Sequence, residues 1–287
     1  MPHFAIMDVD AFLRAADELF DRGPHGHLIP RSPAYAEVSS RVEGMTTANE
    51  LAVLNLAASL LPADEDYLEV GSFKGRSMVG ATLGVSGPIF HAVENYVEFG
   101  MQGADARATL DRHLAEHAAH ADVRLVEGDG FAVLSTAPYP RDIGVYFYDG
   151  EHTSLAHYLA LGVAEPLLAD EALVLIDDAT WPLVARAHQA YLRRHPGWEI
   201  VRRWDSTGND DPHWANGLHA LRFRRPAGAP RRLHPDVRAA LIAQRRAVGP
   251  ARKAIWTIMH KAPWLVPLAK RLEPKRAHKI SPEDHAT

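Results

Sequence analysis

The stretch Tyr67-Leu-Glu-Val-Gly71-Ser-Phe-Lys-Gly75-Arg-Ser77 decides the fold of this 287-residue chain. A short strand at residues 67–70 runs into a glycine turn, and the turn opens a helix expected at residues 77–84. Gly71 and Gly75 have no Cβ, so the backbone can approach a ligand closely there. Phe73 replaces the middle glycine of G-x-G-x-x-G, and no Gly-Lys-Ser/Thr follows. The stretch therefore predicts a ligand-binding loop that is neither a dinucleotide nor a phosphate-loop fingerprint.

Segments typical of strands and helices alternate around this loop. Further strands are expected at residues 89–94, 123–127, 143–149, 173–177, 198–204 and 218–223. Helices are expected at residues 4–22, 104–119, 154–168 and 183–195, and another begins at Thr46 or Thr47 and runs to Pro62. This alternation predicts an α/β fold with a doubly wound, mostly parallel seven-stranded sheet. Such sheets bind ligands beyond the carboxyl ends of their strands, so the residues that follow each strand are the candidate site.

The chain divides into three parts by pattern and charge. We expect an N-terminal helical lid at residues 1–44, a ligand-binding domain at 45–226, and a basic extension at 227–287 with helices at 235–248 and 251–260. Residues 231–287 contain 13 Lys and Arg and 4 Asp and Glu, which gives this segment a charge of +9. Because the whole chain has a net charge of −5, residues 1–230 carry a charge of −14. An acidic body argues against nucleic acid as the main partner. For the basic residues near Trp264, packing on the body or a second subunit is favoured over peripheral membrane contact.

The residue types that are missing also narrow the class of protein. The chain has no cysteine, which excludes disulfides and thiolate metal sites and fits a reducing cytoplasm. No apolar run reaches the roughly 18 residues of a membrane helix, and acidic residues interrupt the N-terminal segment, unlike a signal peptide. We therefore expect a cytoplasmic protein.

The glycine loop resembles the first motif of class I S-adenosylmethionine-dependent methyltransferases. Leu68-Glu-Val-Gly-Ser-Phe-Lys-Gly-Arg-Ser77 is closest to the catechol and caffeoyl-coenzyme A O-methyltransferase branch. The resemblance implies that this loop wraps the methionine part of S-adenosylmethionine and that Glu94 holds the ribose hydroxyls. Val126-Glu-Gly-Asp-Gly-Phe131 is similar to the segment that contacts adenine. The implied cofactor-binding residues are Glu69, Gly71, Ser72, Phe73, Gly75, Ser77, Glu94, Asn95, Gly128, Asp129, Phe131 and Asp149, with Met45 and Thr46 closing over the cofactor.

Acidic residues follow two neighbouring strands of the predicted sheet. One strand ends in Asp149-Gly-Glu-His152 and the next in Asp177-Asp178. Packed carboxylates repel one another unless a proton or a cation joins them, and oxygen ligands suit Mg²⁺. The resemblance implies that Asp149, Asp177 and Asp178 bind Mg²⁺ or another divalent cation. The alternative is that they are ordinary strand-end acids that cap helices or lie in solvent.

The expected chemistry is methylation of a hydroxyl oxygen. The methyl group sits on a sulfonium cation, so the reaction needs an activated nucleophile, and a metal lowers the pKa of a hydroxyl that it holds. His152 and Glu151 are the candidate bases. His152 stands where catechol-type enzymes carry lysine, and Glu151 stands where sugar-modifying relatives carry an acid. The near-neutral pKa of an ordinary histidine slightly favours His152.

Aromatic residues near the acidic pair are candidates for contacting the methyl acceptor. Trp181, and His213 and Trp214 in the loop at 205–217, would suit a sugar or polyketide ring, although a tryptophan that anchors the loop is an equal alternative. We therefore predict a methyltransferase, commonly homo-oligomeric in this branch, that acts on a small hydroxylated metabolite such as a sugar or glycosylated natural product. A metal-independent methyltransferase and a non-catalytic cofactor-binding scaffold remain alternatives.

Overall fold

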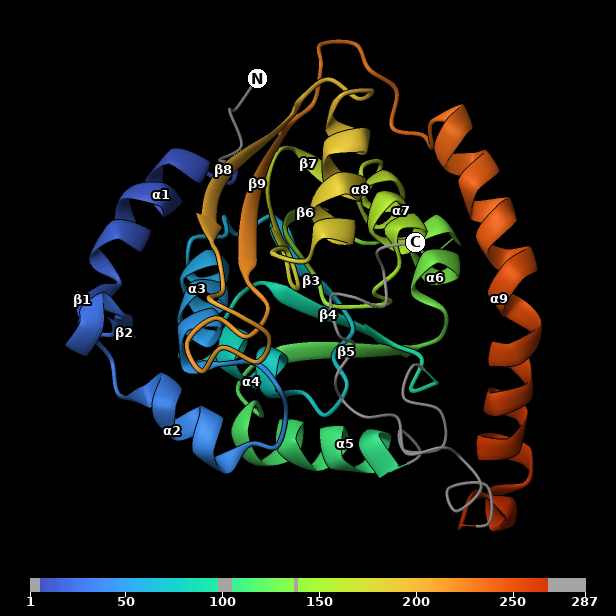
Figure 1. Ribbon diagram of the computed structural model, residues 1–287, viewed down its shortest axis with the longest axis horizontal. Helices are drawn as coiled ribbons and strands as arrows, with labels where there is room; N and C mark the ends of the chain where they lie inside the picture. The colour runs from blue at the N-terminus through green and yellow to red at the C-terminus, as the bar shows by residue number, and fades with distance from the viewer. Residues whose placement is uncertain (1–5, 98–104, 137–138, 268–287) are drawn as a thin grey trace.

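The computed structural model describes residues 6–97, 105–136 and 139–267, and a seven-stranded sheet lies at its centre (Figure 1). Its strands are β3 (Glu65–Val70), β4 (Ile89–Glu94), β5 (Asp122–Glu127), β6 (Asp142–Tyr148), β7 (Leu168–Ile176), β8 (Trp198–Trp204) and β9 (Leu218–Arg224). Their order is β5-β4-β3-β6-β7-β9-β8, and β9 runs antiparallel to β7 and β8 while the other pairs are parallel. The predicted doubly wound, mostly parallel sheet is confirmed, and its order reverses between β3 and β6.

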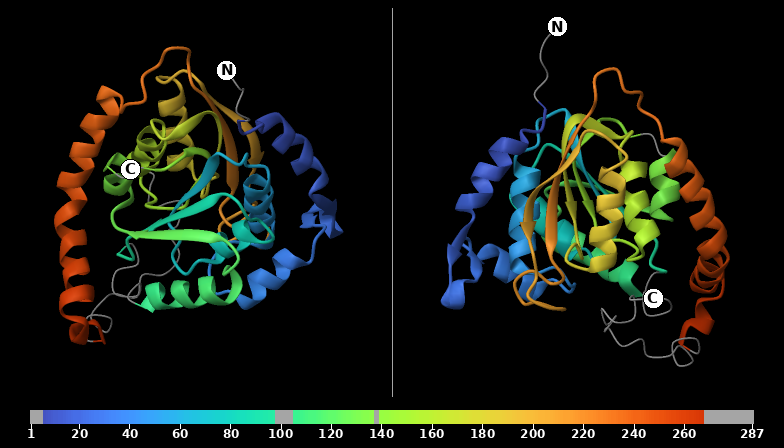
Figure 2. Two further views of the ribbon diagram at one scale, coloured as in Figure 1. Left: turned by 180° about the vertical axis from the view of Figure 1, so that it is seen from behind. Right: turned by 45° about the horizontal axis from the view of Figure 1, so that its top comes forward.

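Helices cover both faces of this sheet (Figure 2). One face carries α1 (Val9–Glu18), α2 (Ala34–Arg41), α3 (Ala48–Ser59), α4 (Arg76–Thr82) and α5 (Ala106–His117), and the other carries α6 (Gly130–Thr136), α7 (Ser154–Ala164), α8 (Pro182–Leu192) and α9 (Pro235–Lys261). Successive strand residues supply the two cores, since side chains alternate along a strand. Tyr67 and Val145 lie in the core under α3, whereas Leu68 and Tyr146 lie in the core under α7.

The N-terminal segment differs from the single helix expected at residues 4–22, of which residues 4 and 5 lie outside the described residues. Helix α1 begins after Asp8, whose carboxylate accepts the N–H of Ala11, and ends at Glu18. Strands β1 (Phe20–Arg22) and β2 (Leu28–Pro30) then form a hairpin around the short helix η1 (Pro24–Gly26). The prediction of helix through residue 22 was wrong because Phe20 is buried against Trp214, with ring centroids 5.5 Å apart, which favours the extended turn.

The C-terminal extension also differs from expectation. Instead of two helices, α9 continues through Pro250 to Lys261 and is followed by η3 (Pro263–Leu265). Its N-terminal part packs on α7, where a Cβ on Gly162 would lie 2.5 Å from Val237, and the helix runs along the outside of the domain (Figure 1). The Trp264 side chain near its end is 75% exposed. Within the described ranges, no helix is long and apolar enough to cross a membrane.

Candidate active site

The carboxyl ends of five parallel strands meet in one row. Backbone hydrogen bonds of 2.9–3.0 Å continue past the strands, from the N–H of Gly128 to the carbonyl of Glu94, from Gly71 to Val93, from Asp149 to Val70 and from Asp177 to Tyr148. These bonds hold the ends of β5, β4, β3, β6 and β7 in register. The residues that the sequence placed after separate strands are therefore neighbours at one edge of the sheet.

A cavity of about 620 Å³, including its open mouth, lies along this edge. The predicted site residues that line it are Met45, Gly71, Phe73, Glu94, Asn95, Gly128, Phe131, Asp149, Glu151 and His152. Gly71 adopts φ +100°, and a Cβ there would lie 1.8 Å from the Asp149 carbonyl oxygen. Only glycine fits this crossing of two strand ends, so the turn depends on it.

Glu94 organises the loop around the cavity. One carboxylate oxygen accepts the N–H of Phe73 at 2.7 Å, and the other accepts those of Asn95 and Tyr96 at 2.7 Å. Phe73 itself has φ +43°, which is costly for a residue with a side chain. The Glu94 carboxylate therefore stabilises the strained cofactor loop from the neighbouring strand.

Other predicted cofactor residues lie behind the cavity wall. The buried Glu69 accepts from the Ser77 hydroxyl at 2.8 Å, and burial raises its pKa to about 7. Ser72 is buried, and Gly75 precedes α4 with φ +87°. Thr46 contributes its carbonyl to Arg76, and Asp129 accepts the N–H of Ala132 in the first turn of α6. These residues shape the loop and the helix starts beside the cavity.

The acidic half of the site gathers around His152. Its Nε2 lies 2.6 Å from Asp178 Oδ2 and 3.8 Å from Asp149 Oδ1. Burial by itself lowers the pKa of His152, but the two carboxylates outweigh it and raise that pKa well above its ordinary value. Burial raises the pKa of Asp149 to about 6, and burial beside Glu50 raises the pKa of Asp177. His152 therefore carries the positive charge that holds this cluster together.

Glu50 belongs to the same cluster, although no pattern in the sequence placed it there. It lies in the first turn of α3, where Thr47 and Glu50 form a capping box. Its Oε2 is engaged by Thr47, whereas the buried Oε1 has no hydrogen-bond partner among the described residues. Burial, with Asp149 and Asp178 nearby, raises the pKa of Glu50 to about 8. The capping-box pattern was visible in the sequence, but only the packing of α3 turns this carboxyl toward the acids.

These donors fit a divalent cation. One oxygen each from Asp149 and Asp178 and one nitrogen of His152 lie within 4.8 Å of one another. Asp177 is next to them, with one oxygen on the N–H of Asp178 at 2.8 Å. A buried carboxylate oxygen without a partner, as in Glu50, is the kind of atom that an ion or water satisfies. The carboxylate oxygens match the preferences of Mg²⁺ and Mn²⁺, and His152 would lie beside the ion.

The three predicted substrate residues have different places. The Trp181 ring lies edge-on to His152, with centroids 5.5 Å apart, at the acidic end of the site. His213 stacks on His27 at 4.4 Å, and its carbonyl accepts from the Thr47 hydroxyl. The Trp214 side chain is 7% exposed and stacks on Trp204 in the core. The structure therefore places Trp181 beside the candidate chemistry, whereas Trp214 packs as an anchor of the 205–217 loop.

The C-terminal extension reaches the site as well. Gln244 of α9 is buried, and its amide donates to Glu151 Oε2 at 3.2 Å. From the sequence, packing of this extension on the body or on a second subunit was expected, without a contact to the site. A glutamine among basic residues on a helix carries no signal of such a contact, which depends on how α9 docks.

Comparison with known proteins shows which domain and folds this architecture is similar to. Residues 68–179 match the family model described as a methyltransferase domain. No curated protein matches the sequence. Cofactor-bound Rv0187 from MTB is 19% identical over 77% of this chain and 98% of its own, with a TM-score of 0.50. The O-methyltransferase TomG from Streptomyces achromogenes, solved with SAM, is 13% identical over 75% of this chain and 96% of its own, with a TM-score of 0.50.

The matched segment begins in β3, includes the glycine loop, and ends just after Asp177 and Asp178, so it contains both halves of the candidate site. The two solved structures share the fold of the surrounding sheet and helices. Residues 68–179 are therefore similar to a methyltransferase domain, and the sheet and helices around them have the class I methyltransferase fold.

Proposed function

We propose that this protein transfers the methyl group of S-adenosylmethionine to a hydroxyl oxygen of a small metabolite. The observation that carries the proposal is the shared cavity, which Gly71 and Glu94 line at one part and Asp149 and His152 at another. A methyl donor held by the glycine loop would thus lie beside groups that can bind and deprotonate an alcohol. Holding both reactants in one cavity is itself a large part of catalysis.

The cofactor half supplies recognition of a nucleoside with a charged sulfur. The Glu94 carboxylate, at the end of β4, can accept from two vicinal ribose hydroxyls. Phe131 and Met45 line the cavity and offer apolar contact for a purine ring. The side-chain carboxylates also give the cavity a negative charge that suits a sulfonium cation. The SAM complex of TomG, which has the same fold, supports this cofactor.

We infer that Asp149, Asp177 and Asp178 hold Mg²⁺ or a similar ion, with Glu50 beside them. When bound, the cation would orient the acceptor hydroxyl and lower its pKa. The cation would also balance the charge of the acids, so that His152 could lose its own proton, and His152 or Glu151 would then accept the hydroxyl proton; both line the cavity. His152 also contacts the acids directly, so it is the better placed of the two. Trp181 beside His152 offers a flat apolar face to a sugar or polyketide ring.

A metal-independent transfer is the second candidate, and one contact favours it. His152 already neutralises Asp178 at 2.6 Å, so this pair can form without an ion. In that case the acids would hold His152 and the acceptor by hydrogen bonds alone. The two candidates differ in what removal of divalent ions does to turnover.

Calorimetric titration with S-adenosylmethionine and with its demethylated product tests the cofactor. We expect binding to the natural chain and at least about tenfold weaker binding to Glu94→Ala, because three backbone donors and the ribose lose their acceptor. Glu116→Ala is a control, since Glu116 is an exposed acid on α5, outside the cavity lining, and pairs with His117. If neither S-adenosylmethionine nor its demethylated product bound to the natural chain, the proposal would be contradicted, and a non-catalytic scaffold role would be favoured.

Methyl transfer is then measured by mass spectrometry on a panel of sugars, glycosides and phenolic or polyketide alcohols. Product methylated on oxygen is expected, and methylation on nitrogen or carbon alone would contradict the acceptor assignment. Treatment with a chelator should abolish turnover and added Mg²⁺ should restore it. Unchanged turnover after complete removal of divalent ions would favour the metal-independent candidate.

A further inference from the structure

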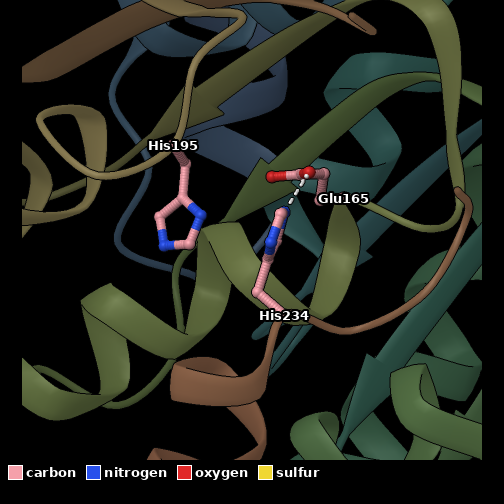
Figure 3. A group of neighbouring side chains, drawn as sticks. All are labelled: Glu165, His195 and His234. Carbon is pink, nitrogen blue, oxygen red and sulfur yellow. Dashed lines mark hydrogen bonds and ion pairs between the residues drawn. The ribbon is translucent and has the colours of Figure 1, made fainter. Parts of the chain in front are cut away.

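A second group of metal-ligating side chains lies away from the candidate active site (Figure 3). It contains Glu165 at the end of α7, His195 after α8 and His234 just before α9, and one donor atom from each lies within 4.8 Å of the others. His234 Nε2 is 2.9 Å from Glu165 Oε1. In Figure 3 the imidazole of His195 presents a ring nitrogen toward this pair. Three separate segments of the chain thus direct one carboxylate and two imidazoles to one point.

The outward-facing atoms of Glu165 and His195 are already bonded. Glu165 Oε2 accepts from the Tyr191 hydroxyl at 2.7 Å and from the Trp198 indole at 2.9 Å. His195 Nε2 lies 3.0 Å from Asp236 Oδ2, and among the described residues no hydrogen bond engages its Nδ1. Metal-ligating histidines commonly bond a carboxylate through the other ring nitrogen, and ligating carboxylates are hydrogen-bonded in turn. The surroundings therefore hold Glu165 and His195 so that one donor atom of each is directed toward His234.

We propose that Glu165, His195 and His234 form a zinc-type cation site that fastens α9 to the methyltransferase domain. Two imidazole nitrogens and one carboxylate oxygen are a donor set that Zn²⁺ takes, with water as the fourth ligand. The Glu165 and His195 side chains are 10% and 5% exposed, whereas that of His234 is 39% exposed. This open side gives an ion a path in and leaves room for the water. A bare Glu165–His234 hydrogen bond would not account for the inward nitrogen of His195.

The position of the site gives it a consequence for the active site. His234 precedes the first turn of α9, and Gln244, in the same helix, bonds to Glu151 in the candidate active site. Val237 and Leu241 pack in between against the core that α7 contributes to. A cation at His234 would therefore hold the start of the helix that brings Gln244 to Glu151. It would act on the position of α9 and take no part in methyl transfer.

Binding of Zn²⁺ and Co²⁺ to the full-length chain tests the proposal. The starting protein is Asp149→Asn/Asp178→Asn, stripped of metal, so that the acidic centre does not contribute. We expect one tight Zn²⁺ per chain by calorimetry, a rise in Tm on addition of Zn²⁺, and a Co²⁺ absorption spectrum typical of four ligands. In the same background, His195→Ala and His234→Ala should each lose the tight binding and the rise in Tm. His117→Ala, which removes a surface histidine beside Glu116, should keep both.

Asp236→Asn tests the supporting shell and should weaken Zn²⁺ affinity by about 10- to 100-fold. His234 is half-exposed, so His234→Gln is a second variant that keeps a polar side chain if the alanine variant fails to fold. Tight binding that survives the His195 and His234 substitutions would overturn the proposal, as would the absence of tight binding in the starting protein. Neither result would bear on S-adenosylmethionine binding, which is measured separately at the cavity.

Discussion

His152 Nε2 lies 2.6 Å from Asp178 Oδ2, so the histidine two residues from the Gly150 turn is held by an acid from the next strand. This contact places the imidazole inside the acidic cluster and beside Trp181. The imidazole is therefore the counter-charge of the acids, and it can act as a proton acceptor only once a cation has taken over that charge.

His152→Ala should lower turnover at least about tenfold, since a positioned general base commonly contributes 10²–10⁴-fold. Its affinity for S-adenosylmethionine should change little, because Gly71 and Glu94 are untouched. Steady-state kinetics and calorimetry measure the two effects. Glu151→Ala is the matched variant, and if it alone abolished turnover while His152→Ala remained active, the base would be Glu151.

Gly71→Ala should abolish cofactor binding or prevent folding, because its Cβ would meet the Asp149 carbonyl oxygen at 1.8 Å. Gly84→Ala is the control. Gly84 also has a positive φ, of +68°, but nothing lies within 4 Å of the added Cβ. That variant should lose only about 1–2 kcal/mol of stability, the cost of a left-handed conformation, and should bind the cofactor normally. Thermal unfolding and calorimetry separate the two, and equal effects would show that strain alone, without the steric clash, explains the result.

Trp214→Ala should destabilise the fold by about 3–5 kcal/mol, because it leaves a cavity in a packed core. Trp214 stacks on Trp204 and contacts Phe20, and its side chain is 7% exposed. Trp181→Ala should instead leave denaturant unfolding nearly unchanged and raise KM for the acceptor, because Trp181 lies beside His152. A loss of stability in Trp181→Ala with unchanged KM would remove it from the acceptor site.

Glu65→Gln should remove a pH dependence of stability. Burial raises the pKa of Glu65 to about 8, from 4.5 ordinarily, so the folded state keeps the proton that the unfolded chain gives up. The stabilisation is complete below pH 4.5 and is lost as the pH rises toward 8. The natural chain should therefore lose stability relative to Glu65→Gln between pH 5 and 9, measured by urea unfolding. Asp64→Asn, at the exposed neighbouring residue, should follow the natural chain, and parallel curves for the natural chain and Glu65→Gln would contradict the prediction.

The sequence by itself determined the sheet, the glycine loop and the order of the strand ends. These features depend on local rules, since apolar residues repeat with the period of a strand or helix and glycine permits the positive φ at residues 71 and 75. Because parallel strands end at one edge, Glu94, Asp149 and Asp177 could be expected together without knowing any contact between their side chains.

Only the tertiary structure decided how side chains distant in sequence meet. Glu50 lies near Asp149 and Asp178 because α3 packs on the sheet. Trp214 lies in the core because its ring packs against those of Phe20 and Trp204. Gln244 reaches Glu151, and His234 reaches Glu165, because α9 docks on α7. Such contacts depend on the shapes of packed surfaces, and no periodicity or spacing along the chain encodes which surface a helix will cover.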